Sequence, residues 1–571
     1  MNSSGKISYS FRRSPLLRWA TGIAILAIII GLFFLFSVKS KAVPQIDSVV
    51  PPVGSPGDVI LISGKNFGSE RDMSYVEIAG SRLTASSYLS WSDNLIRIVL
   101  PASVRDGLVI VGTRDARSAP AIFANETDIP VPVVTNTDFS ATKPVISYLS
   151  AERVSVGDVL VINGSNFGDS RNQSKVYFTA NYNNLIESGD LSNIPVLTEN
   201  MIAASENDYD YISWSDTEIR LHVPDGAYSG VVLVDNRKEK SEPKNLIVSQ
   251  DVGTKSYTNK KIFLVQYSAD IADVSVSNAT VITLRCPLPS VSVSQQQYEM
   301  TEVVPPPLFT GYQNNLIHQV AKSKNDASKS VFSQTFIIPV YEIRSEVKAD
   351  KVSAYKETDR SLYSIAMRPD ELVPSADERI VALADEIAGR EKNPYKKAKL
   401  IYDYMCDNFR IQSDLRKNTA NPLDLLRGKK GDAYDYAVIY TALLRASGIP
   451  AMTDAGILVC RDLMTQSHWW CEFYIEKVGW IPVDPAIGAG LEYKKWSEGI
   501  AADSREYYFG NLDSHHISFS RGWNQLKPFS LDNKIVQQPR SFALQSIWEE
   551  ASENTVKYSS YWTVPVVKGV Y

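Results

Sequence analysis

Residue types that can carry out thiol chemistry are concentrated between Gly431 and Pro485. Four short motifs follow one another there: GDAYD at 431–435, LLRASGIP at 443–450, HWWCE at 468–472 and GWIPVDP at 479–485. A thiol at the start of a helix gains from the helix dipole, and an adjacent histidine can take its proton. An aspartate on the other side of the imidazole ring can fix the tautomer. The open question is which residue would supply the thiol.

These motifs, in this order, resemble those of transglutaminase-like (papain-type) domains over about Ser375–Ala489. In that family a Gly-x-Cys-x-Asp-like turn opens the central helix, and Leu-Leu-Arg-Ala-x-Gly-Ile-Pro follows. A His-x-Trp-x-Glu strand and a Gly-Trp-x-x-x-Asp-Pro strand come next. The resemblance implies that His468 is the base, that Asp484 is its orienting acid, and that the nucleophile position falls on Ala433. It also implies an α+β fold for this part of the chain.

Ala433 has no nucleophilic atom, so the ordinary cysteine mechanism is excluded at this position. We expect Cys406, in the middle of a helix, to be a core residue. Cys471 is three residues after His468, and strand alternation sends these two side chains to opposite faces. Cys460, near a strand end before the histidine, is the remaining candidate for a displaced nucleophile. The fourth cysteine, Cys286, lies far upstream.

The histidine and the aspartate leave two interpretations open: a pocket kept for binding, or a hydrogen-bonded pair that stabilises the fold. Four aromatic residues are expected to cluster near this site, and they suit either peptide or glycan binding or plain core packing. They are Tyr434, Trp469, Trp470 and Trp480. The spacing matches no standard zinc pattern, so we expect no metal and no cofactor. The remaining histidines of this half, His318 and His515–His516, are expected at the surface.

Elements that would position the motifs can also be read from the sequence. Ser375–Glu378 has capping character before an apolar-periodic run, and Asn393-Pro394 opens a second helix. These helices and the motifs together predict a core domain over 372–500. Upstream, residues 258–355 consist of strand-like runs and resemble the β-domain found before transglutaminase-like cores. Downstream, residues 501–571 are rich in aromatic side chains, and we expect an extension that covers the core.

An internal repeat precedes these domains. GDVILISGKNFG and GDVLVINGSNFG start at Gly57 and Gly157 and align without a gap at an offset of 100 residues. Apolar runs of period 2 with turn residues between them predict short antiparallel strands of a sandwich. Phe67 and Phe167 are expected to fill its core beside a glycine turn. The pattern resembles the IPT/TIG immunoglobulin-like fold.

The two copies span 44–127 and 143–249, and the second is longer by about 23 residues around 181–210. We expect both copies to act as spacers that hold the C-terminal domain away from the membrane. Adhesion or ligand binding by their loops is the alternative.

The N-terminal region predicts a membrane anchor. Residues 19–38 form a run of 20 residues without a charge, and about 20 are needed to cross the hydrocarbon core as a helix. The tail 1–18 contains basic residues and no acidic one, which the positive-inside rule places in the cytoplasm. We therefore expect a single-pass protein whose bulk is extracytoplasmic, in the periplasm or at the cell surface. A cleaved signal peptide is the alternative, and it exports the same chain.

Composition narrows the function further. The net charge of −5 and the pI of about 5.8 argue against nucleic-acid binding. The fold class is therefore multidomain: a membrane helix, two IPT/TIG-like sandwiches, a third β-domain and an α+β transglutaminase-like domain. The leading hypothesis is an envelope protein that presents a non-catalytic domain to a peptide, protein or cell-wall ligand. The alternatives are an active thiol acyltransferase or peptidase with a displaced nucleophile, and a purely structural spacer or adhesin.

Overall fold

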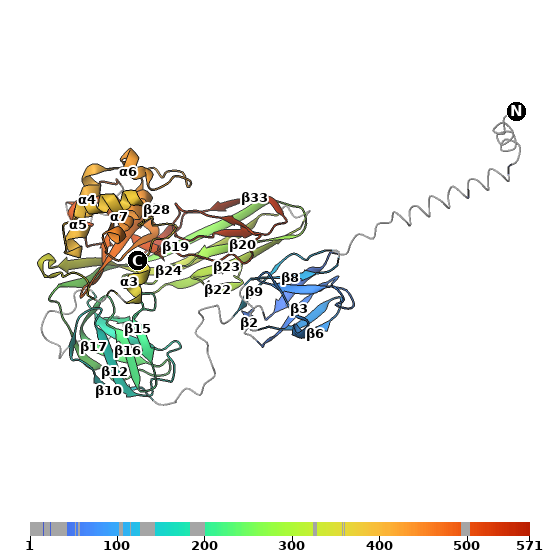
Figure 1. Cartoon of the computed structure of the whole chain (residues 1–571), viewed down its shortest axis with the longest axis horizontal. Coiled ribbons are helices and arrows are strands. Elements are labelled where there is room, and N and C mark those ends of the chain that lie inside the picture. Colours follow the sequence, from blue (N-terminus) through green and yellow to red (C-terminus); the bar gives the residue numbers. More distant parts are fainter. Residues whose placement is uncertain are drawn as a thin grey trace. The chain divides into compact units, whose positions relative to one another are not determined.

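The computed structural model describes residues 43–571 except for gaps at 52, 55–56, 102–106, 115, 126–142, 183–199, 324–327, 357, 359 and 493–502, and it also describes Pro15 and Ile23. Apart from these two residues, the expected tail (1–18) and membrane helix (19–38) lie outside the described part. Within that part, none of the helices combines the length and the apolar character needed to cross a membrane. The chain divides into two compact units, Met1–Asp128 and Ile129–Tyr571 (Figure 1).

The described part of the first unit is a β-sandwich. One sheet has the order β1-β3-β7-β6 and the other has the order β2-β9-β8-β4-β5. The bounds are β1 Gln45–Val50, β2 Val53–Gly54, β3 Val59–Lys65, β4 Tyr75–Ile78, β5 Ser81–Arg82, β6 Tyr88–Trp91, β7 Leu95–Val99, β8 Gly107–Gly112 and β9 Ala121–Asn125, with a 3₁₀ turn at Ala85–Ser87. Inward-facing apolar residues of both sheets, such as Ile60 on β3 and Val109 on β8, form its core.

The second unit begins with a sandwich that repeats this topology. Its sheets have the orders β10-β12-β16-β15 and β11-β18-β17-β13-β14, which match the first sandwich strand for strand. The bounds are β10 Val145–Leu149, β11 Arg153–Val154, β12 Val159–Ser165, β13 Lys175–Ala180, β14 Met201–Ala203, β15 Tyr211–Trp214, β16 Glu218–His222, β17 Ala227–Asp235 and β18 Lys244–Val248. We call it the second sandwich.

The repeat is confirmed in detail at the turn after the third strand of each copy. Phe67 and Phe167 are buried, at 0% and 1% exposure, as the sequence predicts. In each copy a tryptophan indole donates to the carbonyl of that phenylalanine, with N–O distances of 3.1 and 3.2 Å. Gly68 and Gly168 both have a φ of +93°, which is a conformation that glycine tolerates best.

Two long strands dominate the β-domain that follows. β19 (Gly253–Val276) and β24 (Ser330–Val347) pair antiparallel along most of their length. The first sheet has the order β21-β24-β19-β33, with β34 also pairing to β19, and the second has the order β22-β23-β20-β32-β31. The remaining bounds are β20 Thr280–Pro287, β21 Glu299–Val304, β22 Phe309–Tyr312, β23 Asn315–Lys322, β31 Lys534–Val536, β32 Glu549–Ala551, β33 Thr555–Trp562 and β34 Val566–Val570.

Residues 501–571 cover the core domain in part, since Tyr507, Phe509 and Leu544 pack into its hydrophobic core. Only β30 (His516–Arg521) joins the core sheet, whereas β31 to β34 complete both sheets of the β-domain. The pairing has a buried ionic contact: Arg285 on β20 donates to Glu550 on β32, and both side chains are 0% exposed. The β-domain is therefore discontinuous in sequence, with its last strands supplied by the end of the chain.

The core domain has a four-stranded sheet of order β29-β28-β27-β30, with helices packed on one face (Figure 1). Its strands are β27 Ala451–Val459, β28 Thr465–Ile475 and β29 Gly479–Val483. The other elements are η4 Ala349–Lys351, α3 Ser361–Ala366, α4 Glu378–Ala388, α5 Pro394–Asn408, β25 Arg410–Ile411, α6 Asp424–Gly428, β26 Lys430–Gly431, α7 Ala433–Ala446, α8 Pro485–Gly488 and α9 Ser504–Tyr507. The predicted helix starts are confirmed, because Asp377 caps α4 and Asn393 caps α5.

The second sandwich is fixed to the core domain by polar contacts. Lys255 on β19 donates to both carboxylate oxygens of Asp225 at 2.8 Å, and also to the Trp480 carbonyl at 2.6 Å. Gly479, with a φ of +102°, leaves the space that Asp225 occupies, since a Cβ there would lie 1.9 Å from an oxygen of that carboxylate.

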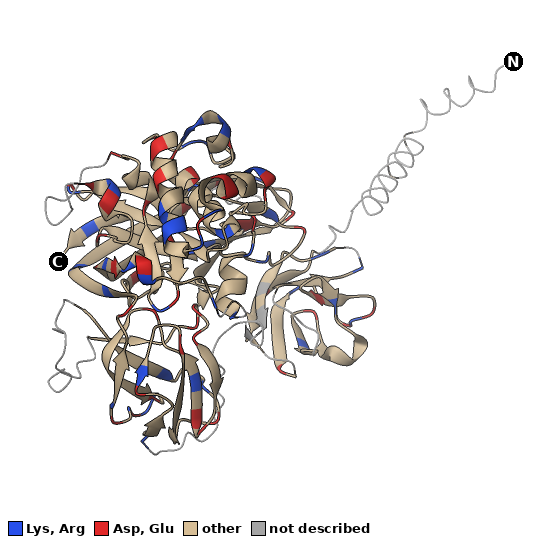
Figure 2. Ribbon diagram, turned by 60° about the vertical axis from the view of Figure 1, so that its left-hand side comes forward, with Lys and Arg blue, Asp and Glu red and all other residues tan. Residues whose placement is uncertain are grey.

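Acidic and basic residues are interspersed across the chain in the view of Figure 2.

Candidate functional site

The predicted histidine and aspartate, His468 and Asp484, lie next to each other on the sheet of the core domain. His468 lies on β28, and Asp484 follows β29 as the N-cap of α8. His468 Nε2 lies 2.5 Å from Asp484 Oδ2, and His516 Nε2 on β30 lies 3.1 Å from the same oxygen. All three side chains are 0% exposed. The other oxygen of Asp484 accepts hydrogen bonds from two backbone N–H groups of α8.

A second aspartate extends this cluster. His516 Nδ1 lies 2.8 Å from Asp513 Oδ1, so both ring nitrogens of His516 face carboxylates. Burial lowers the pKa of His516, but Asp513 and Asp484 outweigh it and raise the pKa to about 9. Burial likewise raises the pKa of Asp484, and the two histidines more than offset this and hold it far below its usual range. The cluster therefore favours a charged His516 between two carboxylates.

His468 has one ring nitrogen without a partner. With Nε2 engaged by Asp484, its Nδ1 is buried and makes no hydrogen bond. A histidine held this way on one nitrogen has the other available for proton transfer to a reacting group. His468, Asp484 and His516 could each offer one ligand atom to a metal ion, since these atoms lie within 4.8 Å of one another, but here the three side chains contact each other.

Ala433 is the first residue of α7 and is 4% exposed. Before it, Asp432 caps the helix in a reciprocal capping box with Asp435. Buried Arg540 bonds to both of these carboxylates, and its guanidinium lies 4.5 Å from the Tyr434 ring centroid. At the position where the resemblance implies a nucleophile, the chain therefore has a methyl group, and it lies at the start of a helix with a reciprocal capping box.

The aromatic residues that were expected to cluster together are divided between the two faces of the sheet. Trp469 packs against Tyr434 on the face covered by α7, with ring centroids 5.5 Å apart. Trp470 lies on the other face, 6.3 Å from the His468 ring and 5.2 Å from the His516 ring. Strand alternation explains the division, because Trp469 and Trp470 are neighbours in β28.

Trp480 also belongs to the face that carries Trp470. Its ring lies beneath the Arg521 guanidinium at 4.9 Å, and its indole N–H donates to Asp208 at 2.9 Å. Trp480 therefore joins the second sandwich to the core domain instead of contacting Tyr434.

Of the four cysteines, Cys286, Cys460 and Cys471 are buried and Cys406 is half-buried. The Cys471 thiol donates to the Ala437 carbonyl of α7 at 3.2 Å, on the face opposite His468, as alternation predicts. Cys460 follows β27 and lies four residues beyond Gly456, the sheet partner of His468, or roughly 13 Å along the strand at about 3.3 Å per residue. Burial raises the pKa of Cys286, of Cys406 (to about 12) and of Cys471, so these thiols are protonated at neutral pH.

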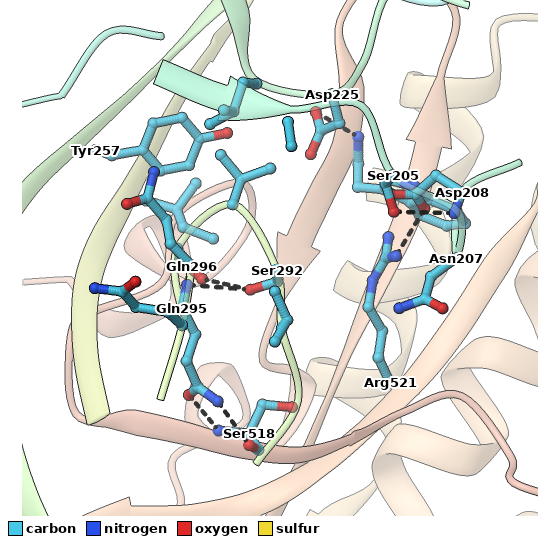
Figure 3. A pocket seen from close by; sticks show the side chains of 18 of the residues that line it. Ser205, Asn207, Asp208, Asp225, Tyr257, Ser292, Gln295, Gln296, Ser518 and Arg521 are labelled. Carbon is cyan, nitrogen blue, oxygen red and sulfur yellow. Dashed lines mark hydrogen bonds and ion pairs between the residues drawn. The ribbon is translucent and has the colours of Figure 1, made fainter. Parts of the chain in front are cut away.

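A cavity of about 570 Å³ opens on the His516 and Trp470 face of the sheet. Its walls come from the second sandwich, from the segment Val291–Gln297 of the β-domain and from the core strands. Figure 3 shows Tyr257, Gln296 and Ser292 on one side of it, with Asp208 and Arg521 on the other. The cavity is thus built by three parts of the chain within one compact unit.

Sequence reasoning missed several residues of this region. His318 and His515–His516 were expected at the surface but are buried, at 1%, 4% and 3% exposure. His515 and His516 are buried because β30 pairs with β27, which places a segment that looks polar inside the fold. The alternation of SHHISFSR was the only local signal for this strand. No signal in the sequence could have paired Asp225 or Asp208 with residues more than 250 positions away.

Comparison with known proteins supports the two resemblances. The transglutaminase-like superfamily matches residues 381–485, and the IPT/TIG domain matches residues 44–124. The chain contains a transglutaminase-like domain. An uncharacterized protein of Haemophilus influenzae is 29% identical over 174 residues, which are 26% of this chain and 46% of that protein. The chain spans less than half the length of the curated relatives it matches.

The solved structures that this chain resembles have lower sequence identity. A Cytophaga hutchinsonii protein described as a candidate cysteine protease covers 55% of this chain and 93% of its own, with 15% identity and a TM-score of 0.36. The periplasmic domain of TgpA from Pseudomonas aeruginosa covers 42% of this chain and 88% of its own, with 13% identity and a TM-score of 0.24.

Proposed function

We propose that this protein is a membrane-anchored, extracytoplasmic protein whose transglutaminase-like domain binds a ligand and does not perform thiol chemistry. The observation that carries the proposal is Ala433 at the start of α7, where the family motif has its cysteine. A methyl group cannot form an acyl intermediate. The retained His468–Asp484 pair then serves the architecture beside the cavity.

The positions of the cysteines count against a displaced nucleophile. A substitute thiol would need to lie within hydrogen-bond reach of His468 Nδ1. Cys471 points to α7, and Cys406 is half-buried on α5. Cys460, which the sequence left as the best substitute, is roughly 13 Å away along the sheet.

The proposed location rests on the sequence. The uncharged run 19–38 is long enough for one membrane crossing, and the basic tail before it favours the cytoplasm. Residues 43–571 would then be exported, and the first sandwich would act as the spacer. Protease digestion of intact and of permeabilised cells tests this orientation: the bulk of the chain should be cleaved without opening the cytoplasmic membrane.

The experiment that tests the loss of thiol chemistry restores the missing sulfur. In the full-length chain, Ala433→Cys is compared with Ala446→Cys, which introduces a thiol at the opposite end of the same helix. Thiolate formation is followed against pH by absorbance at the thiolate band and by iodoacetamide alkylation with mass spectrometry. We expect the thiol at position 433 to ionise well below about 8.5, and the thiol at position 446 not to.

Two outcomes would overturn the proposal. If position 433 gives an ordinary thiol, this is not a former nucleophile position. If a native cysteine of the unmodified chain has a low pKa, or if the unmodified chain turns over an acyl substrate in a way that iodoacetamide abolishes, the domain is an enzyme.

A further inference from the structure

The floor of the cavity contains more carboxylates than cations. Lys255 pairs with Asp225, with side-chain exposures of 4% and 10%. Arg521 bonds to Asp208 at 2.6 Å and also to Glu472, and these three side chains are 11–15% exposed. The fourth lining carboxylate of the floor is Asp454 on β27. Four acids therefore surround two permanent cations.

His516 also lines the cavity, but its charge is already matched. Both of its ring nitrogens contact carboxylates, Asp484 and Asp513, which do not line the cavity. The remaining lining cations, Arg171, Lys175 and Lys240, belong to the second sandwich at the rim, where both lysines are exposed and Arg171 pairs with Glu206. The floor is thus acidic, and the rim is basic.

One carboxylate oxygen of Asp454 has no hydrogen-bond partner among the described residues. The residue is 5% exposed, yet its Oδ1 makes no hydrogen bond. Its neighbour Thr453 donates to Thr441 on α7, so strand alternation turns Asp454 to the opposite face, toward the cavity. Burial and the charge of Glu472 raise the pKa of Asp454 well above its usual range. A buried carboxyl oxygen without a partner is costly, and a ligand that donates to it would remove that cost.

A second buried polar atom on the cavity wall lacks a partner. Tyr257 is 0% exposed, lines the cavity, and its hydroxyl makes no hydrogen bond. Figure 3 shows this ring on the wall that faces Asp225 and Arg521. Trp470 adds aromatic surface to the same cavity, and aromatic faces attract cations, whereas the Trp480 ring already lies beneath Arg521.

The wall also offers a backbone edge. β14 is the last strand in its sheet within the described chain, and its residues Met201–Ala203 line the cavity, where the Met201 carbonyl accepts a hydrogen bond of 3.4 Å from Gln296. An edge strand can pair through its backbone with an extended peptide. The volume of about 570 Å³ falls within the usual range for a small-ligand site, roughly 300–1,000 Å³.

We propose that this cavity binds the primary ammonium group of a peptide, with Asp454 as its hydrogen-bond acceptor and β14 alongside the peptide backbone. An ammonium group supplies three donors, which suits an acidic floor with unsatisfied oxygens. A metal ion fits less well, because three of the four acids are already paired with Lys255 or Arg521. The inference rests on the proposed binding role and names its site and ligand class.

The test measures binding of a defined probe to the full-length chain by calorimetry. The probe is the tripeptide Ala-Lys-Ala, which has an α-ammonium and a side-chain ammonium. Three arms separate them: the N-acetylated tripeptide, the tripeptide with norleucine in place of lysine, and the tripeptide with both changes. We expect the doubly changed peptide not to bind, and whichever singly changed peptide still binds identifies the recognised amine.

Variants assign the binding to the cavity. Asp454→Asn keeps the shape but cannot ionise opposite a bound ammonium group as the acid can, and we expect it to weaken binding by at least about tenfold. Glu152→Gln removes an exposed acid of the second sandwich that does not line the cavity, and it should leave the affinity unchanged. The thermal midpoint of Asp454→Asn should be no lower than that of the wild type, because the change removes a poorly satisfied buried acid. A purely structural acid would instead lower it.

Several results would overturn the inference. Wild-type protein that binds no amine-bearing arm at millimolar concentration excludes it, as does equal binding of the doubly changed peptide. Unchanged affinity in Asp454→Asn also excludes it. If Asp454→Asn does not fold, Tyr257→Phe decides, since it should weaken the same binding. Thiol-dependent turnover would overturn the proposed function without affecting these results, and unchanged binding in Asp454→Asn would leave the Ala433→Cys result standing.

Discussion

Buried His516 gives a quantitative pH prediction. It lies between Asp513 at 2.8 Å and Asp484 at 3.1 Å, and its side chain is 0% exposed. Although burial alone would lower its pKa, the two carboxylates raise the pKa from 6.5 to about 9 in the folded chain. At pH values between 6.5 and about 9, the folded chain therefore keeps a proton on His516 that the unfolded chain would lose.

The sign of the effect on stability follows from linkage. The folded pKa is above the unfolded value, so protonated His516 contributes fully below pH 6.5, and the contribution is lost as the pH rises through 9. At about 1.4 kcal/mol for each pH unit across this window, the loss amounts to roughly 3 kcal/mol. No allowance for solvent screening is needed, because the ring is fully buried.

The assay uses selective ¹⁵N labelling of histidine in the full-length chain, which has only five histidines. The signal that disappears in His516→Gln identifies the residue, and its titration midpoint should fall near 9. His318 is the matched control, because burial lowers the pKa of this second buried histidine to about 4. In urea unfolding, the wild type should lose stability between pH 6.5 and 9, and His516→Gln should lose much less. A midpoint for His516 at or below 6.5, or equal slopes, would refute the reasoning.

Two further predictions concern the assembly of the second unit. Gly479→Ala should destabilise the chain by at least about 1 kcal/mol more than Gly490→Ala, because both glycines have positive φ but only the first would place a Cβ against a carboxylate. Equal thermal midpoints for these two variants would contradict the packing argument. Arg285→Met should cost about 3–5 kcal/mol by leaving Glu550 buried and unpaired, whereas Lys396→Met at an exposed ion pair should cost under about 1 kcal/mol. Similar midpoints for these two variants would show that the buried pair does not hold the C-terminal strands.

Local signals were sufficient for much of this fold. The caps Asp377 and Asn393 start their helices where the sequence predicts, since capping depends on residues within one turn. The repeat predicted two sandwiches, and Phe67 and Phe167 lie in their cores. The motif order placed His468 close to Asp484, which the structure joins by a hydrogen bond.

The errors arise where long-range pairing decides. β33 and β34 pair with β19 nearly 300 residues earlier, and no local pattern distinguishes such a partner from the nearer core sheet. The expectation of a single aromatic cluster was wrong for a different reason. Trp469 and Trp470 were treated as one wall, although neighbours on a strand face opposite sides.

The two sandwiches share a topology, but the structure gives the second one contacts that their similarity in sequence did not predict. The difference lies in the extra residues of the second copy, around 181–210. Asp210 in this segment bonds to Arg360 of the core domain at 3.0 Å, and Asp208 bonds to Arg521 and to the Trp480 indole. Burial and the charge of Asp208 raise the pKa of Asp210 to about 8, so this acid is held near neutral charge at physiological pH.

A domain that serves only as a spacer gains nothing from buried acids of this kind. A spacer needs only a stable sandwich, and burying carboxylates that must find partners in another domain costs stability when a partner is missing. The same segment supplies β14 and Asp208 to the cavity wall. If the proposed site binds its ligand, the second sandwich has a role in binding that the first does not share, and the spacer expectation for the first sandwich stays a prediction.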